Sequence, residues 1–288
     1  MMFDIVIQLV INGLLLGGIY ALLSIGLTLI FGVLEIVNFA HGEFLMVSMY
    51  LTFLLFSVFG IDPYLSLVII IPIFFLFGFA VEKIIIRPLL NDPPLNQIFA
   101  TIGLGLIFSN LALLLFKADF RTVKTSYSNA NLIFGNYFIS VPRLIAFAIA
   151  ITLIAALLIY LKKTFTGKAI RALAQQRKAA MLMGINVHTT YAIAFGMGIA
   201  AVGAAGAVLM PIFFVFPTVG SLFSLIAFVV VILGGYNSLL GSLVAGLIIG
   251  LIEGFSGFFI SPHLKEVVYF VLFIFILIFR PTGLFGKR

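Results

Sequence analysis

The feature that most limits what this chain can fold into is a series of long segments without Asp, Glu, Lys or Arg. The longest includes residues 189–252. A bilayer core about 30 Å thick takes about 20 helical residues at 1.5 Å each, so this segment alone is long enough for about three crossings. The chain is 64% apolar and 9% charged, whereas a soluble domain is roughly 45–50% apolar and 25% charged. A water-soluble globule is therefore excluded, and we predict an all-α, polytopic transmembrane bundle.

The expected bundle has nine membrane-spanning helices, and eight or ten also fit the pattern. Pro211, Pro217 and Gly220 mark one turn within the longest apolar segment, and residues 234–238 (GGYNS) mark the next. The expected spans are residues 5–34, 44–60, 63–81, 94–116, 143–161, 189–210, 218–233, 239–256 and 266–280. The first is long enough to contain a break. No soluble domain or linker interrupts them, so residues 1–288 are expected to form one transmembrane domain.

The basic residues predict the orientation of the bundle. Residues 162–178 hold six Lys or Arg and no acid, and such loops concentrate on the cytoplasmic side. With nine alternating spans, eleven of the 16 basic residues fall inside. The C-terminus is then cytoplasmic, whereas the N-terminus and residues 117–143 are external. The basic residues lie in short loops rather than on a domain-sized face, so nucleic-acid binding is a poor interpretation of the net charge of +7.

The densest polar cluster follows the first span and consists of Glu35, Asn38, His41 and Glu43. On a helix the first three would fall within an arc of about 120°. An ionisable group at membrane depth costs on the order of 2.5–3.5 kcal/mol, which makes the cluster a candidate permeation path. The equally weighted alternative is a short inner loop whose polar groups face water. The spacing of His41 and Glu43 does not place two metal ligands on one helical face, so no metal site is expected.

Two further features concern packing and the outer boundary. Small residues recur at intervals of four as Ser242, Gly246, Gly250 and Gly254, a spacing that lets another helix approach closely. We interpret this stripe as a helix-packing surface. Glu253 lies beside it, near the expected outer boundary, where a carboxylate is more often solvated than functional.

The expected cytoplasmic segment, residues 162–188, contains a short amphipathic helix. Its weak apolar side is formed by Ile170, Leu173, Ala174, Met181 and Ile185, and Gly184 suits a helix C-cap. One interpretation is an interfacial helix that binds anionic lipid headgroups. The other is a docking helix for a soluble partner.

Several signatures of enzymes are absent from the sequence. Gly167-Lys168 is followed by Ala169, and Gly286-Lys287 by Arg288, so neither forms a Walker phosphate loop. H-E-x-x-H and G-x-S-x-G do not occur either. The chain has no cysteine, which excludes a cysteine nucleophile, thiolate metal sites and disulfides. We therefore expect a chain that is not an enzyme and does not hydrolyse nucleotide by a phosphate loop.

Several segments resemble one family, the LivH-type permease subunits of branched-chain amino acid ABC importers. The similarity begins at GLLLGGIYALLSIGLTLIFGVLEIVNFAHGEF (residues 13–44), continues through Arg87-Pro88 and residues 100–103 (ATIG), and is strongest over residues 167–185. It extends through VVVILGGYNSLLGSLVAG (residues 229–246) and the tail RPTGLFG (residues 280–286). Gln176 and Asn237 depart from the residues usual in the family.

The resemblance implies a permease domain in the cell inner (cytoplasmic) membrane that transports Leu, Ile or Val. Its partners would be a second permease, LivM-like or a second copy, two cytoplasmic ABC ATPases and an external solute-binding protein. No cofactor is implied in this chain, because ATP and Mg would be bound by the ATPases. Urea, short amides and other amino acids remain open as substrates. Rival classes are an ion-coupled carrier and, much less favoured, an intramembrane enzyme.

The polar residues and the resemblance together suggest two sets of functional residues. The expected substrate pathway consists of Glu35, Asn38, His41, Glu43, Thr101 and Glu253. The expected ATPase-coupling helix includes Gly167, Lys168, Arg171, Ala172, Ala180 and Gly184.

Overall fold

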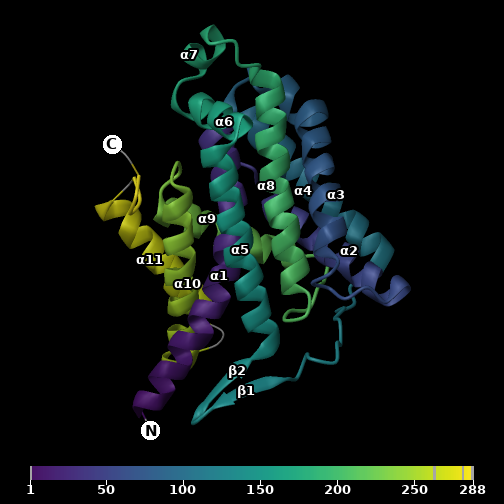
Figure 1. Cartoon of the computed structure of the whole chain (residues 1–288), viewed down its shortest axis with the longest axis vertical. Helices are drawn as coiled ribbons and strands as arrows, with labels where there is room; N and C mark the ends of the chain where they lie inside the picture. The colour runs from purple at the N-terminus through teal and green to yellow at the C-terminus, as the bar shows by residue number, and fades with distance from the viewer. Residues whose placement is uncertain (1, 262–263, 281, 287–288) are drawn as a thin grey trace.

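The computed structural model describes residues 2–261, 264–280 and 282–286 of the chain. Within that part, nine apolar helices form the bundle (Figure 1). They are α1 (Met2–Leu34), α2 (His41–Phe59), α3 (Leu67–Val81), α4 (Pro94–Phe116), α5 (Val141–Lys163), α8 (Val187–Leu209), α9 (Val219–Gly234), α10 (Leu239–Phe259) and α11 (Lys265–Phe279). The expected all-α bundle of nine helices is confirmed.

The nine helices differ in how far they could reach across a bilayer. Seven stretches are long and apolar enough to cross it, including α3 together with the short turns that follow it. The other two, α9 and α11, have 16 and 15 residues. At 1.5 Å per residue these two helices are shorter than a 30 Å hydrocarbon core. The first helix is continuous over 33 residues, so the break allowed for within residues 5–34 does not occur.

Short elements lie at the two ends of the bundle. A hairpin of β1 (Asn131–Phe134) and β2 (Tyr137–Ser140) lies near the N-terminus, whereas α6 (Phe165–Gln175) and α7 (Arg177–Leu182) lie at the opposite end (Figure 1). A π-helical turn η1 (Glu82–Ile86) and a 3-10 turn η2 (Arg87–Leu89) follow α3. Residues 117–143 and 162–188 therefore lie at opposite ends, as the basic residues predicted. Arg288, which was expected with the second group, lies outside the described residues.

The core forms where α1 packs against α8 and α10. A Cβ on Gly17 would lie 2.7 Å from the Leu247 Cα, and one on Gly246 would lie 2.6 Å from the Ala21 nitrogen. Gly250 likewise faces Gly17 across the same contact. Such distances are too short for any larger residue, so the small residues of α10 allow the backbones to touch. The interpretation of this stripe as a packing surface is confirmed.

Candidate functional site

The chain leaves the helical conformation directly after α1. Leu34 is the last helical residue, Glu35 takes a left-handed φ of 58°, and residues 35–38 form no helix. Ile36, Asn38 and Ala40 are nonetheless buried. Irregular backbone at membrane depth is tolerated where protein covers it or it lines a cavity. The expectation that Glu35, Asn38 and His41 share one helical face is therefore wrong, because the helix that would align them ends at Leu34.

The segment after α1 folds back to the middle of the bundle, where α2 begins. The Nε2–H of His41 donates to the Leu23 carbonyl at 3.0 Å, and Leu23 lies in the interior of α1. Asn38 Oδ1 accepts from the Ala40 N–H at 3.1 Å and so holds the turn before α2. The Thr101 hydroxyl of α4 bonds to the Ile98 carbonyl at 3.0 Å and, at 3.4 Å, to that of Val37. His41, Asn38 and Thr101 thus shape the break between the helices.

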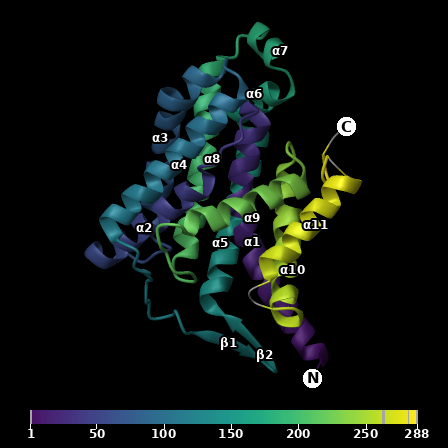
Figure 2. The same cartoon turned by 180° about the vertical axis from the view of Figure 1, so that it is seen from behind.

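The first turns of α2 and α9 meet at this point. The Gly42 N–H donates to the Ser224 hydroxyl at 2.8 Å, and a Cβ on Gly220 would lie 2.8 Å from the Gly42 oxygen. A side chain on Gly42 would collide with the Gly220 carbonyl oxygen, so glycine is required there. From this contact α2 runs toward the hairpin end and α9 toward the end with α6 and α7 (Figure 2). Two helix N-termini therefore converge inside the bundle.

A cavity of about 560 Å³ opens beside the two converging N-termini. Glu43 of α2 lines it, and Ser224 Oγ donates a long hydrogen bond of 3.5 Å to Glu43 Oε2. The other polar lining residues are Ser109, Asn110, Thr218 and Ser221, and the apolar ones include Phe39, Ile102, Leu106, Leu225 and Phe228. The cavity therefore combines one carboxylate, several hydroxyl or amide groups and a large apolar wall.

The carboxylate of Glu43 has no cationic partner within the part of the chain that the structure describes. No Lys, Arg or His nitrogen there lies within 4.0 Å of it. Its side chain is partly buried, and the N-termini of α2 and α9 contribute partial positive charge nearby. A site with one uncompensated carboxylate and two helix N-termini can bind an ammonium group and a carboxylate at the same time.

The remaining predicted pathway residues lie elsewhere. Glu35 is exposed in a separate cleft of about 410 Å³, beside Gln176 and Arg177 near α6 and α7. Glu253 is only 7% exposed, and the Tyr20 hydroxyl donates to its Oε2 at 2.6 Å. The expectation of a solvated Glu253 is therefore wrong. The predicted set is therefore split among four places, and only Glu43 lines the cavity between α2, α4 and α9.

Five polar cavity residues did not emerge from the sequence reasoning: Ser109, Asn110, Thr218, Ser221 and Ser224. A signal was present, because each is a polar residue within an otherwise uncharged apolar span, where polar groups are costly unless a cavity or partner holds them. Ser221 and Ser224 also have the spacing of three that places two side chains on one helical face.

The segment expected to form one amphipathic helix forms two. Gln176 has an extended conformation, with φ of −159° and ψ of 103°, and separates α6 from α7. The Thr164 hydroxyl caps α6 by accepting from the Gly167 N–H at 3.0 Å. Gly184 has a φ of 79°, which confirms the left-handed helix end expected there. The single-helix prediction is wrong because the backbone extends at one residue.

The two short helices turn different kinds of side chain outward. Ile170, Leu173, Ala180 and Gly167 are buried, Ala172 is partly buried, and Lys168 and Arg171 are exposed. The tip of the segment carries three exposed apolar side chains, Met181 (54%), Leu182 (89%) and Met183 (83%). We refer to Met181, Leu182 and Met183 as the α7 tip. The sequence reasoning assigned only Met181 to an apolar side, although three apolar residues before a helix-ending glycine were visible.

Comparisons with known proteins agree with this architecture. Residues 9–277 match a family described as the branched-chain amino acid transport system permease component. The chain is 31% identical, over 98% of its length and 96% of the relative's, to the high-affinity branched-chain amino acid transport system permease protein BraD of Pseudomonas aeruginosa. It is 32% identical, with the same coverage, to the permease protein LivH of Escherichia coli K12. A probable LivH of Methanocaldococcus jannaschii is 27% identical over 97% of this chain and 92% of the relative. No solved structure matches.

Proposed function

The chain belongs to the family of branched-chain amino acid transport permeases, and from this premise we propose that it carries Leu, Ile and Val into the cell as the membrane subunit of an ATP-driven importer. The relatives named for this transport align with nearly the whole chain. The alternative within the same family is a permease for urea, short amides or other amino acids. The carboxylate of Glu43 in the cavity beside α2 and α9 supports amino acids over uncharged substrates.

The observation that carries the proposal is Glu43 in the cavity between α2, α4 and α9. An amino acid has one ammonium and one carboxylate group, and the carboxylate of Glu43 pairs with the first. The partial positive charge at the N-termini of α2 and α9 attracts the second, as at other helix N-termini that bind anions. Phe39, Ile102 and Leu225 supply apolar surface for a branched side chain. Urea lacks both charges and gains nothing from Glu43.

The two helices that begin inside the bundle, α2 and α9, lead from this site toward opposite ends of the bundle. Discontinuous helices whose N-termini face a substrate near the midplane are a recurrent arrangement in transporters. Here α2 leads from the cavity toward the hairpin end, and α9 leads toward the end with α6 and α7 (Figure 2). We infer that tilting of these two helices opens the site alternately to each side.

We infer the partners from the family and from the exposed surfaces of the chain. The cavity is open on the face formed by α2, α4 and α9, and we propose that a second permease, either LivM-like or a second copy, closes it. On the cytoplasmic side, α6, α7 and the α7 tip would dock onto an ATPase that binds ATP and Mg. The exposed apolar side chains of this tip suit a protein groove better than water. The external solute-binding protein would meet the opposite end, and the C-terminus would be cytoplasmic.

Uptake by the reconstituted complex tests the substrate. The complex of this chain with its partner permease, ATPases and solute-binding protein is placed in liposomes, and uptake of labelled leucine is measured with ATP inside. We expect ATP-dependent uptake that unlabelled isoleucine and valine compete away and urea does not. Uptake without ATP, or competition by urea alone, would contradict the proposal.

Retention of the ATPases tests the coupling segment. Arg171→Glu, Gly184→Val and Leu182→Ser should leave the protein folded but reduce co-purification of the ATPase subunits in detergent free of anionic lipid. Gly184 needs a left-handed conformation that a β-branched residue disfavours. Lys124→Glu, an exposed charge reversal at the opposite end, is the control. Full retention of the ATPases by all three variants would contradict docking, whereas a small effect that appears only with anionic lipid would favour the headgroup-binding interpretation.

A further inference from the structure

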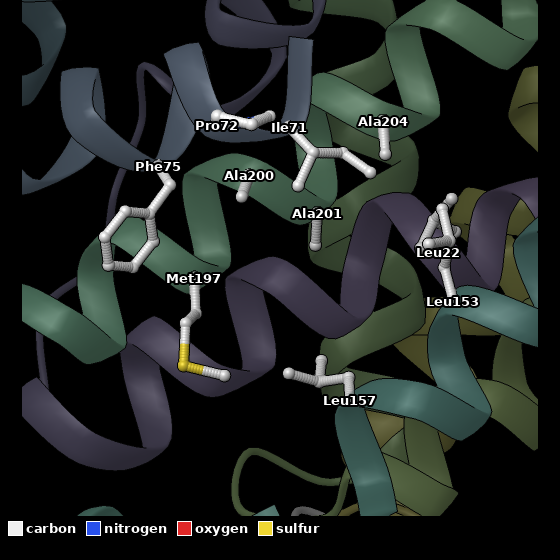
Figure 3. A pocket seen from close by; sticks show the side chains of 10 residues that line it. All are labelled: Leu22, Ile71, Pro72, Phe75, Leu153, Leu157, Met197, Ala200, Ala201 and Ala204. Atoms are coloured by element: carbon white, nitrogen blue, oxygen red, sulfur yellow. The ribbon is translucent and has the colours of Figure 1, made fainter. Parts of the chain in front are cut away.

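A second cavity, of about 310 Å³, is lined by α1, α3, α5 and α8 and shares no lining residue with the Glu43 cavity. It is an open groove between α3 and α5, and the side chains of α8 form its floor (Figure 3). Its walls include Ile71, Pro72 and Phe75 of α3 and Leu153 and Leu157 of α5. No ionisable or hydroxyl-bearing side chain lines it. This groove, which we call the α3–α5 groove, differs from the Glu43 cavity in having no charged or hydroxyl group.

Small residues explain why the α3–α5 groove exists. Ala200, Ala201 and Ala204 of α8 face it and leave room where larger residues would fill the space (Figure 3). The same helix packs tightly on α3 elsewhere, since a Cβ on Gly203 would lie 2.6 Å from the Phe74 ring. The surface of α8 is thus covered by α3 on one side and left open toward α5.

The position of the α3–α5 groove determines what can enter it. Its lining residues come from the middle turns of α1, α3, α5 and α8, the depth at which bilayer hydrocarbon surrounds the protein. Water needs two to four polar partners in a buried site, and this lining offers almost none. The available material that matches the groove chemically is a lipid acyl chain.

The charged residues beyond one end of the α3–α5 groove indicate which lipid headgroup would suit it. Toward the end with α6 and α7, α3 is followed by the exposed Lys83, and α5 ends in the exposed Lys162 and Lys163. Glu82, the residue before Lys83, is fully buried and paired with Arg87 at 2.8 Å. Leu157 is five residues from Lys162, or about 8 Å along the helix, a distance that the upper part of an acyl chain can cover. Basic groups between transmembrane helices bind anionic headgroups.

We propose that the α3–α5 groove binds one acyl chain of an anionic phospholipid whose headgroup lies among Lys83, Lys162 and Lys163. The bound lipid fills the space between α3 and α5 and covers α8 where no helix does. The site is independent of the substrate cavity, so its test does not depend on transport.

The absence of tryptophan makes the test direct, because one introduced tryptophan becomes the sole tryptophan of the chain. Phe75→Trp places the reporter in the groove wall, and Leu76→Trp places it at the same depth on the exposed side of α3, where Leu76 is 65% exposed. The purified protein is put in phosphatidylcholine vesicles with a small fraction of brominated phosphatidylglycerol or brominated phosphatidylcholine, and quenching is compared. At position 75 we expect quenching by brominated phosphatidylglycerol to be at least threefold stronger than quenching by brominated phosphatidylcholine. At position 76 we expect the two lipids to quench equally.

Two further variants connect the signal to the groove and its rim. Ala201→Leu, combined with Phe75→Trp, should fill the groove and remove the preference for the anionic lipid. Replacing Lys83, Lys162 and Lys163 with Gln should also remove it while leaving the reporter accessible to phosphatidylcholine. Met197→Trp is a second groove reporter, should Phe75→Trp fail to fold. Equal quenching by both lipids at the groove reporter, or a preference that survives the three lysine substitutions, would overturn the proposal.

Discussion

Glu43 of α2 and Glu253 of α10 both lie within long apolar helices, but their surroundings differ. Glu43 faces an open cavity and receives one long hydrogen bond of 3.5 Å from Ser224. Glu253 is 7% exposed and receives a short bond of 2.6 Å from the Tyr20 hydroxyl. A carboxylate held by a buried donor stabilises the contact between its helices, whereas one that faces a cavity without a cation is available to bind a ligand. On this basis we propose that Glu253 is a structural acid and Glu43 a substrate-binding acid.

The backbone around each glutamate differs in the same way. Glu43 lies in the first turn of a helix that begins inside the bundle, after a break held by Asn38 and His41. Glu253 lies within a continuous helix whose glycines touch α1. A helix that begins inside the bundle presents the unpaired N–H groups of its first turn to a site. Within a continuous helix, the same groups are bonded to carbonyls of the preceding turn. The predictions below test this contrast, from the largest expected effect to the smallest.

The largest effect is expected for Glu43→Gln. The amide is isosteric but cannot pair with a substrate ammonium, and loss of one partner of such a charge pair costs about 2–5 kcal/mol. Uptake of labelled leucine by the reconstituted complex should fall on the order of 100-fold. The melting temperature should change little. Uptake within a factor of two of the unaltered protein would remove the distinction between the two glutamates.

Glu253→Leu should lower the stability of the protein, whereas the complex should still take up leucine. The substitution removes the acceptor of the buried Tyr20 hydroxyl, and an unsatisfied buried group costs about 1–3 kcal/mol. Thermal unfolding in detergent measures the loss. Tyr20→Phe combined with Glu253→Leu should cost less than the sum of the two single changes, because they share one interaction. Loss of uptake without loss of stability would instead make Glu253 a transport residue.

Ser224→Ala is expected to have an intermediate effect on uptake. Ser224 accepts from the Gly42 N–H at 2.8 Å and donates to Glu43, so it positions both groups. Loss of one hydrogen bond of about 1 kcal/mol corresponds to a rise of about fivefold in the KM for uptake. Ser221→Ala, one turn away in the same cavity, is the matched control and should change KM less. Equal effects of both substitutions would argue against positioning by Ser224.

The smallest effect concerns a tyrosine and carboxylate pair outside the membrane. Tyr127 donates to Asp62 at 2.7 Å and stacks on Tyr64, which fastens residues 117–140 to the turn before α3. Tyr127→Phe should lower stability by about 1 kcal/mol without changing uptake in the liposome assay. Unchanged stability of Tyr127→Phe would show that the hydrogen bond between Tyr127 and Asp62, unlike that between Tyr20 and Glu253, does not stabilise the fold.

The same pair predicts a dependence on alkaline pH. Burial and the bond to Asp62 raise the pKa of Tyr127 above its ordinary value of about 10. Because the folded state favours the neutral phenol, the stabilisation is present below pH 10 or so and is lost as the pH rises through the folded pKa. Phenolate absorbance of the parent minus that of Tyr127→Phe measures this titration, and a midpoint near 10 would contradict the raised pKa.

The sequence predicted the fold more fully than the site. Long uncharged segments predict helices because only helices satisfy every backbone group in lipid. The nine apolar helices, the packing role of the small-residue stripe that contains Gly246 and the left-handed Gly184 are all confirmed. The shared helical face of Glu35 and His41 was wrong, because a periodicity argument assumes that the helix continues. The break at Gln176 was missed for the same reason.

The sequence by itself determined that this protein is a bundle of membrane helices. It also determined that the basic segment and the long polar loop lie at opposite ends of that bundle, and it carried the resemblance to the family. These properties depend on composition, on the length of apolar segments and on local motifs, which any one stretch of chain carries. Only the tertiary structure separated Glu43 from Glu35 and Glu253, brought Ser224 to the start of α2 and left a groove beside α8. Each of these depends on where distant helices start and how closely they pack, and that is decided by contacts between residues far apart in the chain.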